Sequence, residues 1–348
     1  LDIFSILNII YGERTEINKT TYDSWRSYKT PLPHWVFAGD SVTWDRENEY
    51  FLPALFVKFN PLSWLTLRYA STKTLTRPNY TDVIPYWEID GPGSSVDYRT
   101  ADLTPGVSEN TDYSVSVNNN YLGFFTVTYF EKTIANLIYN SGSRYIIDPR
   151  EYGLPSGTKN YIMRNYTFNN HFPVSLKGVE FDWQTRFWYL PGPLRGLVLN
   201  ANYTVTESEV KYPRTILEYD LDWSTFPPTL TTTNIDTFYT DRLIDQPNEI
   251  INLSIGYDYK GFSGRLSMLH QSNIFARTDF WPELRVNTAD YTRWDLSIKQ
   301  DLPLAGLSVF LNVNNITEAV DVNRFKYNSL SYEQHYGRTA DLGFKYSF

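Results

Sequence analysis

The chain has 348 residues, of which 17% are aromatic and 42% hydrophobic, and its 31 basic against 39 acidic residues give a net charge of −8. A chain with this many aromatic residues can bury enough apolar surface to fold, which excludes disorder. The acidic balance lacks the basic surface that nucleic acid requires, so we exclude nucleic acid as a partner. The absence of Cys excludes disulfides, thiolate metal sites and a cysteine nucleophile.

The composition also excludes two further classes of protein. No apolar run reaches the roughly 18 residues of a helical membrane span. The four His residues, His34, His171, His270 and His335, show no ligand-like spacing. We therefore predict no metal site and no cofactor. The fold classes that stay open are a soluble β-sandwich, a solenoid and a transmembrane β-barrel.

Strict alternation of apolar and polar residues is the main local signal. In residues 251–259 every odd position is apolar, from Ile251 to Tyr259, and polar residues or Gly lie between them. This period of two predicts β-strands and excludes helices. In chain order we expect about twelve strands, at residues 3–18, 50–59, 64–72, 111–117, 121–139, 175–190, 196–207, 249–259, 262–271, 291–300, 307–314 and 339–348.

The connections between these strands alternate in length. Short turns are expected at 60–63, 118–120, 191–193, 260–261 and 301–304, and long polar connections at 19–46, 73–108, 140–161, 210–247, 276–288 and 318–336. Transmembrane barrels have short periplasmic turns at one end and long extracellular loops at the other. The fold class that we predict is all-β, a transmembrane antiparallel up-and-down β-barrel, and residues 1–348 show no composition break that would mark a second domain.

The alternating faces of such strands have different environments. In a bilayer one face meets lipid and is apolar, whereas the other meets the lumen and is polar. Paired carboxylates such as Glu180 and Asp182 are geometrically compatible with acid–base catalysis, but a charged lumen wall predicts the same spacing, so we predict no catalytic site and no enzyme. The predicted lumen-facing or plug-facing residues are Arg68, Glu180, Asp182, Arg186, Arg265, Asp295, Lys299 and Lys345.

Two long connections combine aromatic rings with charged groups. Rings that stack beside carboxylates suit sugars, peptides or metal chelates, and packing of the loops against themselves is the competing interpretation. The candidate ligand-binding residues are Tyr86, Trp87 and Asp90 in one connection and Tyr219, Asp220, Trp223 and Arg242 in the other.

Five motifs in the same order resemble the bacterial TonB-dependent outer-membrane receptors. They are the "RP" loop motif in LRYASTKTLTRPNY (67–80), a strand start in LTPG (103–106), LKGVE (176–180), VNNIT (313–317) and the last strand YGRTADLGFKYSF (336–348). In the second motif Gly106 and Val107 replace the charged residues that are usual in the family. The ending with Tyr346 and Phe348 resembles the signal that the barrel assembly machinery reads.

The resemblance implies a 22-stranded barrel with an N-terminal plug, in which these strands form the C-terminal part. Neither a plug nor a TonB box has a counterpart in this sequence, so we expect either that the rest of the receptor is separate from this chain or that the chain is half of a split barrel. The implied function is energy-coupled uptake of a siderophore, vitamin, oligosaccharide or peptide across the bacterial outer membrane. The implied partners are the outer-membrane bilayer, the remainder of the receptor with its plug, the TonB complex, the barrel assembly machinery and a surface lipoprotein.

Two alternatives stay open from the sequence. One is a self-contained barrel of about twelve strands, acting as a porin or an outer-membrane enzyme, whose first strand would pair with its last. The other is a soluble, aromatic-rich β protein that binds carbohydrate, which would stay in solution without detergent.

Overall fold

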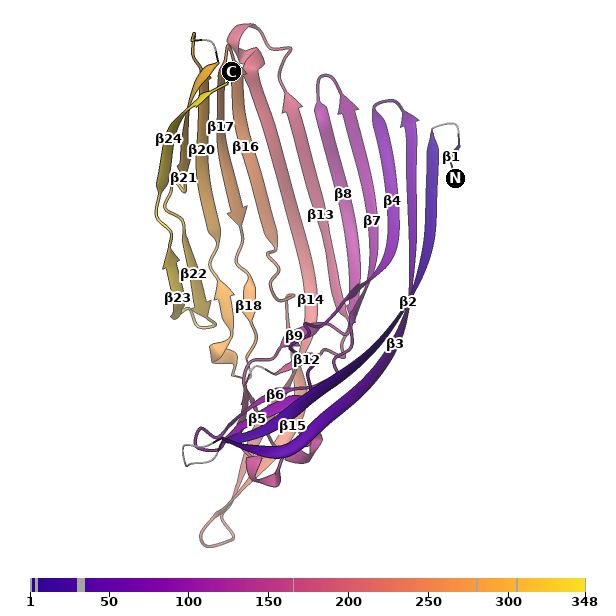
Figure 1. Ribbon diagram of the computed structural model, residues 1–348, viewed down its shortest axis with the longest axis vertical. Coiled ribbons are helices and arrows are strands. Elements are labelled where there is room, and N and C mark those ends of the chain that lie inside the picture. The colour runs from indigo at the N-terminus through magenta and orange to yellow at the C-terminus, as the bar shows by residue number, and fades with distance from the viewer. Residues whose placement is uncertain are drawn as a thin grey trace.

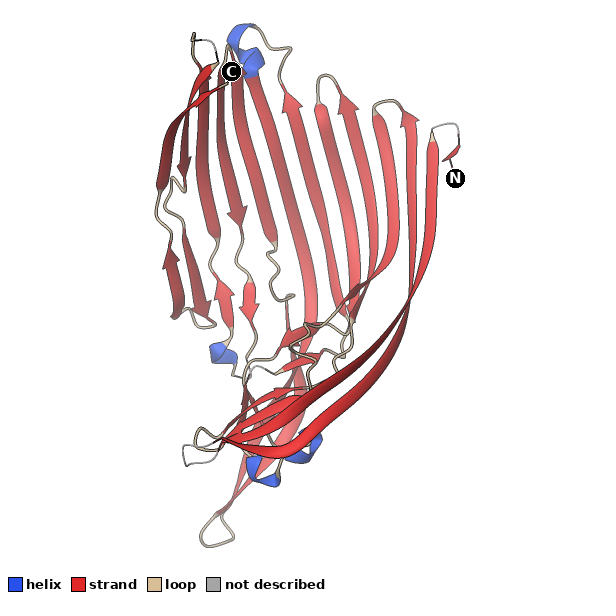
Figure 2. Ribbon diagram, in the orientation of Figure 1, coloured by secondary structure: helices blue, strands red, loops and turns tan. Residues whose placement is uncertain are grey.

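Nearly all regular structure in this chain is β-strand, as Figure 2 shows for a computed structural model that describes residues 2–3, 6–29, 35–164, 166–279, 281–304 and 306–347. The helices within these residues are short 3-10 turns: η1 (Pro149–Tyr152), η2 (Ser156–Thr158), η3 (Gly192–Gly196) and η4 (Pro282–Leu284). In the described residues we find no helix with the length and apolar character that crossing a membrane would take.

Long strands form one antiparallel sheet that bends into an open trough (Figure 1). In spatial order they are β2 (Leu7–Lys29), β3 (Trp35–Leu62), β4 (Leu65–Thr76), β7 (Gly106–Asn119), β8 (Gly123–Ala135), β13 (Val174–Arg186), β14 (Leu197–Asp222), β16 (Glu249–Tyr259), β17 (Phe262–Gln271), β20 (Tyr291–Asp301), β21 (Leu307–Asn314) and β24 (Thr339–Tyr346). A short strand, β1 (Asp2–Ile3), pairs with the start of β2. The prediction of an all-β antiparallel sheet of about twelve strands is confirmed.

The register of the sheet collects apolar side chains on one face, which we call the outer face. Phe181 on β13 lies opposite Val127 on β8 and Tyr203 on β14, and the same row continues through Val115 on β7. Two of the apolar residues in this row are clearly exposed, Val115 by 47% and Phe181 by 38%. A continuous band of exposed apolar residues is the surface that a barrel presents to lipid.

The opposite, inner face is polar. A hollow of about 310 Å³ is lined in part by its residues Asp182, Asn200, Ser254 and Asp295. The register puts the eight residues that were predicted to face the lumen on this one face, and their role toward a lumen or plug stays a prediction: Arg68, Glu180, Asp182, Arg186, Arg265, Asp295, Lys299 and Lys345.

Aromatic residues lie on either side of the apolar row that contains Val115 and Phe181. Part-way along β4, β7 and β8, Tyr69, Tyr113 and Tyr129 lie side by side, with ring centroids 5.2 and 6.5 Å apart. At the short-turn end Tyr121 packs against Trp188, at 5.7 Å. Two aromatic rows of this kind match the girdles that sit at the two membrane–water interfaces.

The two ends of the sheet differ as the alternating connection lengths predict. Short connections lie together at the end that is uppermost in Figure 1. One is the two-residue turn between β16 and β17, where Lys260 and Gly261 both have positive φ (48° and 79°), as a tight hairpin turn requires.

Two of the predicted long loops are instead hairpins of extended strand. β2 and β3 stay paired from Leu7–Phe59 to Lys29–Trp35, across most of the predicted connection 19–46. β14 continues to Asp222 and pairs with β15 (Thr229–Asp241). Both segments were predicted to be loops because their residues are polar on both faces, which removes the alternation. Cross-strand backbone pairing nevertheless extends the strands beyond the apolar band.

The long connections other than the β2–β3 hairpin form what we call the loop layer. It comprises residues 77–105, 136–173, 210–248, 272–290 and 315–338. It contains the short strands β5 (Tyr86–Asp90), β6 (Ser95–Arg99), β9 (Ile138–Asn140), β10 (Arg144–Tyr145), β11 (Ile162–Arg164), β12 (Thr167–Asn169), β18 (Phe275–Arg277), β19 (Val286–Thr288), β22 (Val320–Phe325) and β23 (Leu330–His335), together with β15. β6 pairs in parallel with β11, and β5 with the far end of β2, so the layer is tied to the wall through the backbone.

Buried apolar residues gather in the loop layer rather than in the wall. The first loop core comprises Trp87, Ile89, Val96, Ile146, Leu154 and Met163. The second loop core comprises Tyr139, Val174, Val210, Tyr212 and Phe275. Wall side chains face either the outer or the inner side, so only the folded connections can bury apolar groups against one another.

We predict that a charge on the outer face destabilises the sheet in a bilayer. Leu253 lies on the outer face of β16, opposite Ala201 and Met268, and its neighbour Asn252 lies on the inner face. In lipid vesicles Leu253→Arg should lower the free energy of unfolding by about 2–4 kcal/mol, because the charge enters hydrocarbon. Asn252→Arg should change it by less than about 1 kcal/mol. Equal effects of the two substitutions in urea titrations would contradict the assignment of faces.

Candidate ligand-binding site

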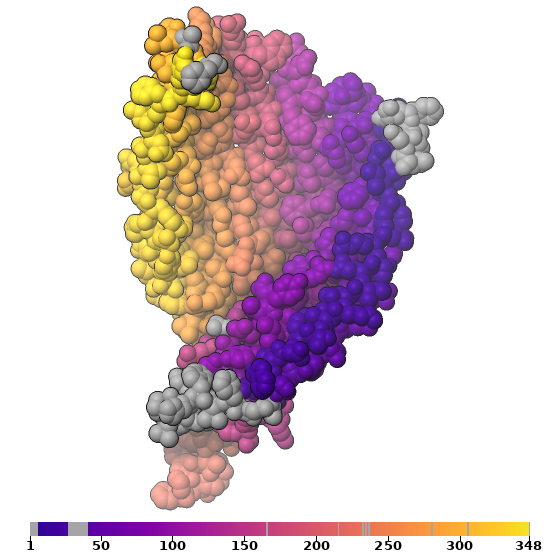
Figure 3. All heavy atoms as spheres, in the orientation of Figure 1, coloured from indigo at the N-terminus to yellow at the C-terminus, as the bar shows by residue number. Residues whose placement is uncertain are grey.

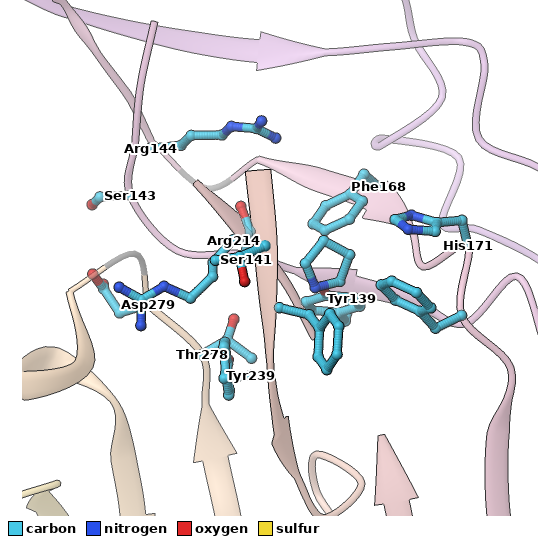
Figure 4. A pocket seen from close by; sticks show the side chains of 14 residues that line it. Tyr139, Ser141, Ser143, Arg144, Phe168, His171, Arg214, Tyr239, Thr278 and Asp279 are labelled. Atoms are coloured by element: carbon cyan, nitrogen blue, oxygen red, sulfur yellow. The ribbon is translucent and has the colours of Figure 1, made fainter. Parts of the chain in front are cut away.

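A cavity of about 390 Å³ opens in the loop layer beside the second loop core (Figure 4). Segments that are far apart in sequence form its walls: the β9–β10 region, the end of β12, the paired part of β14 and β15, and the segment that follows β18. The lining residues are Tyr139, Ser141, Ser143, Arg144, Phe168, His171, Phe172, Pro213, Arg214, Thr237, Phe238, Tyr239, Thr278 and Asp279.

Aromatic rings form one wall of the cavity. Tyr139 packs against Phe168 with ring centroids 4.7 Å apart and meets the ring of Tyr212 edge-on at 5.1 Å. Tyr212 in turn stacks on Tyr239 at 5.2 Å. Because Tyr212 and Tyr239 are direct partners on β14 and β15, the strand register itself builds this aromatic wall.

Positive charge predominates around the cavity. Arg144 and Arg214 line it, and Figure 4 shows Arg214 extending toward the side where Asp279 and Thr278 lie. Behind Tyr239 a third cation, Arg285, places its guanidinium carbon 3.3 Å from the centroid of the Tyr239 ring, and its side chain is only 4% exposed. Burial lowers the pKa of Arg285, yet a guanidinium stays protonated at neutral pH.

Asp279 is the one carboxylate among the lining residues. Its Oδ1 accepts a hydrogen bond from the backbone N–H of Trp281, at 3.0 Å. Burial raises the pKa of Asp279 above its ordinary value, an effect that this hydrogen bond partly opposes. Asp279 therefore offsets only part of the surrounding positive charge.

The segment that follows β18 is held closely against the end of β9. The hydroxyl of Thr278 donates to the backbone carbonyl of Asn140. Gly142 has φ +74°, and a Cβ at this position would lie 2.8 Å from the carbonyl oxygen of Thr278. A side chain at position 142 would therefore push the two segments apart and open the cavity.

The predicted ligand-binding residues of the first connection do not reach this cavity. Trp87 is buried in the first loop core, which fits the interpretation that the loops pack against themselves. Tyr86 donates to Glu88 on the same strand, and Asp90 accepts from the backbone N–H of Gly93 in the turn between β5 and β6. These three residues therefore lie within the β5–β6 hairpin and its packing.

The predicted residues of the second connection lie apart from one another. Tyr219, Asp220 and Trp223 are exposed near the tip of the β14–β15 hairpin, which projects as the lower lobe in Figure 3. Arg242 lies at the base of this hairpin, where Nη1 donates to the backbone carbonyl of Asn273 at 2.7 Å. None of the seven residues lines the cavity, and their role in ligand binding stays a prediction.

Sequence reasoning missed the residues that do line the cavity. Arg144, Arg214 and Asp279 come from three connections, and only tertiary packing brings them together. The available signal was the presence of arginines in connections that also carry aromatic residues. In the described part of the chain no group of three or more His, Cys, Asp or Glu side chains is placed to hold a metal ion.

Two tryptophans provide a test of which loop residues are structural. Trp87→Ala should lower the local unfolding free energy of the β5–β6 hairpin by about 3–5 kcal/mol, because it empties a packed core. Trp223 is 76% exposed, so Trp223→Ala should change the local unfolding free energy of its own β14–β15 hairpin by less than about 0.5 kcal/mol. Amide hydrogen exchange measures both, and unchanged exchange in Trp87→Ala would contradict the first loop core.

Asp279 makes the stability of the loop layer depend on pH. The pKa of Asp279 is higher in the folded protein than in the unfolded chain, where it is about 3.8, so the folded state binds the proton more tightly. Its contribution to stability is present at low pH and is lost as pH rises through the raised pKa. Asp279→Asn should remove this component. The measurement is the hydrogen-exchange protection of β18 in wild type and variant between about pH 4 and 7, a range that begins near the unperturbed pKa. The protection of wild type relative to the variant should fall as pH rises, and a rise would contradict the burial of the carboxylate.

Comparison with known proteins places this architecture in a family. Residues 5–316 match the family model described as TonB dependent receptor-like, beta-barrel. No curated protein sequence matches the chain.

Several solved receptor structures share the fold. The ferric-catecholate import receptor Fiu of E. coli K12 has a TM-score of 0.63 at 12% identity over 99% of this chain and 42% of its own. The siderophore receptor PiuA of Acinetobacter baumannii has a TM-score of 0.60 at 12% identity, over 99% of this chain and 41% of its own. The Serratia marcescens hemophore receptor HasR, solved with its hemophore HasA and heme, has a TM-score of 0.59 at 15% identity, over 99% of this chain and 49% of its own.

The chain spans less than half the length of the solved structures it matches. The family match, by contrast, runs from β2 through β21 and includes most of the loop layer. An antiparallel wall with an apolar outer face, a polar inner face and long connections at one end fits that match throughout. The chain belongs to the family of TonB-dependent receptor β-barrels.

Proposed function

We propose that this chain forms part of the wall and outer mouth of a bacterial outer-membrane receptor that takes up a nutrient with energy delivered through TonB. The observation that carries this proposal is the family match over a wall whose outer face is apolar and whose inner face is charged. The partners are the outer-membrane bilayer, the remainder of the receptor including a plug, the TonB complex, the barrel assembly machinery and a surface lipoprotein.

The inner face supplies the groups that would contact a plug. Several of them are held by neighbours on the wall: Arg68 donates to Ser116 at 2.8 Å, and Glu180 accepts from Asn202 at 2.7 Å. Arg265 forms an ion pair with Asp258, at 2.7 Å. Groups that are fixed in this way present a defined pattern of charge to a domain inside the barrel.

The last strand provides a candidate signal for insertion into the membrane. Tyr346, on the outer face of β24, is 57% exposed and belongs to the terminal aromatic pattern. Phe348 lies outside the described residues. We assign both residues to recognition by the barrel assembly machinery.

The cargo that we favour is a siderophore-type ligand, before a vitamin, an oligosaccharide or a peptide. The printed names of the similar structures support this choice, because they describe receptors for a ferric catecholate, a siderophore and a heme-bearing hemophore. These relatives are receptors rather than enzymes, which favours transport over catalysis.

Two observations weigh against the alternative functions. A self-contained barrel of about twelve strands needs its first and last strands to pair, and in the described residues β24 pairs with β21 and not with β2. A soluble carbohydrate-binding protein would expose to water the apolar band that includes Val115, Phe181 and Ile255.

Dependence on TonB tests the proposed transport. Cells that carry the receptor should bind ferric enterobactin or heme at the surface and accumulate radiolabelled iron from at least one of them. Cells that lack TonB should retain the binding but lose the accumulation, because release from the receptor requires energy. Accumulation at the same rate without TonB would contradict the proposal and favour a passive pore.

A further inference from the structure

Unpartnered polar atoms are concentrated at the cavity in the loop layer. In the described part of the chain six buried side-chain nitrogen or oxygen atoms lack a hydrogen-bond partner. Two of them belong to residues that line this cavity, the hydroxyl of Tyr139 and Nε of Arg214. A third, Nη2 of Arg285, belongs to the side chain that packs on the ring of Tyr239, itself a lining residue. A buried donor without a partner destabilises a fold, so this grouping needs an explanation.

The strand register explains why these donors lie near one another. Arg214 is two residues after Tyr212 on β14 and therefore shares its face, beside the Tyr239 ring that lines the cavity. Arg285 covers that ring from behind, with its guanidinium 3.3 Å from the centroid. Tyr139, 6% exposed, lines the same cavity from β9.

The charges indicate the sign of the missing partner. Arg214 and Arg285 are both cations beside one tyrosine ring, and like charges at such a site repel each other. Asp279 is the one carboxylate among the lining residues, and one of its oxygens already accepts from the backbone of Trp281. Asp241 is a second carboxylate that acts on Arg285. Arg144, Arg214 and Arg285 therefore still outnumber the carboxylates near the cavity. An anion in the cavity would accept from the unpartnered donors and relieve this repulsion.

The walls indicate the shape of the partner. The aromatic residues Tyr139, Phe168 and Tyr239 line a space of about 390 Å³, which suits a planar ring more closely than a flexible chain. A guanidinium and a phenol are both donors that match the oxygens of a carboxylate.

We propose that this cavity binds a carboxylate carried on a planar ring, with the Tyr139 hydroxyl and Arg214 Nε–H as donors to the carboxylate and Arg285 as the neighbouring cation. Only the origin of the ligand rests on the proposed function: the carboxylate would be the acidic portion of the cargo. Binding itself is a property of this cavity and is measured without transport.

Two small probes of nearly equal shape test the charge requirement. Benzoate and benzamide differ by one charge, and inorganic phosphate carries charge without a ring. By calorimetry on the purified receptor in detergent, benzoate should bind at least about tenfold more tightly than benzamide, because a hydrogen bond to a charged group is the stronger one. Equal affinity for benzoate and benzamide, or binding of phosphate without benzoate, would overturn the proposal.

Two tyrosines in contact, Tyr139 in the cavity lining and Tyr212 in the second loop core outside it, provide a matched pair of variants. Tyr139→Phe removes a hydroxyl that has no partner, so it should raise the melting temperature without ligand and weaken benzoate binding about tenfold. The hydroxyl of Tyr212 donates to the carbonyl of Arg242 at 3.0 Å and accepts from the N–H of Ile244 at 2.9 Å. Tyr212→Phe should therefore lower the melting temperature and leave affinity for benzoate within about twofold of wild type.

Arg214→Gln provides an independent check in case the tyrosine variants change the packing. It should weaken benzoate binding about tenfold and leave benzamide binding unchanged, since only the charged ligand uses the cation. Benzoate should also slow amide exchange in residues 137–144 and 278–279, the segments that meet at the cavity. Wild-type affinity for benzoate in both Tyr139→Phe and Arg214→Gln would overturn the assignment, whereas loss of uptake with intact benzoate binding would fault only the transport function.

Discussion

The structure depends on one constraint: the wall strands pair their backbones side by side, while the side chains of each strand alternate between two environments. From β7 to β24 the antiparallel register of the wall runs without an interruption, so Phe181 and Tyr203 remain on the outer face while Asp182 and Asn202 remain on the inner face. Register shifts occur only in the β2–β3 and β3–β4 pairings of the described wall. In a bilayer the backbone groups have no other partners, which makes this pairing obligatory. This pairing also fixes where a core can form, because a wall that is one sheet thick has no interior.

The apolar core therefore lies in the connections. Trp87 and Tyr212 are examples of aromatic residues that a soluble β protein would place between two sheets; here they pack within the loop layer. A layer with its own cores can hold a cavity in a fixed shape, which loops without packing could not do. The extended β14–β15 pairing contributes directly, because it sets Tyr239 and Arg214 along one side of the cavity and packs Tyr212 against Tyr239 from the second loop core.

The polar groups of the wall and of the cavity are satisfied to different degrees. On the inner face Arg265 has Asp258, and Arg68 has Ser116, so these charges are held within the wall. At the cavity Arg214 and Arg285 carry buried N–H groups that the described residues leave unpaired. A receptor gains selectivity from such groups because a ligand that completes their hydrogen bonds is favoured over one that does not. The same groups reduce the stability of the empty site.

The sequence by itself determined the wall. Alternation such as Ile251 to Tyr259, with turns such as Lys260–Gly261, specifies strand positions, connection lengths and the two faces, because these features depend on residues two apart or on a local turn. It did not determine how far the β2–β3 and β14–β15 hairpins extend, since polar residues on both faces leave no alternation. Nor did it indicate that Trp87 is buried or that Arg144, Arg214 and Asp279 meet. Those outcomes depend on contacts between segments many residues apart, such as Thr278 with Asn140, for which no local pattern exists, so only the tertiary structure decided them.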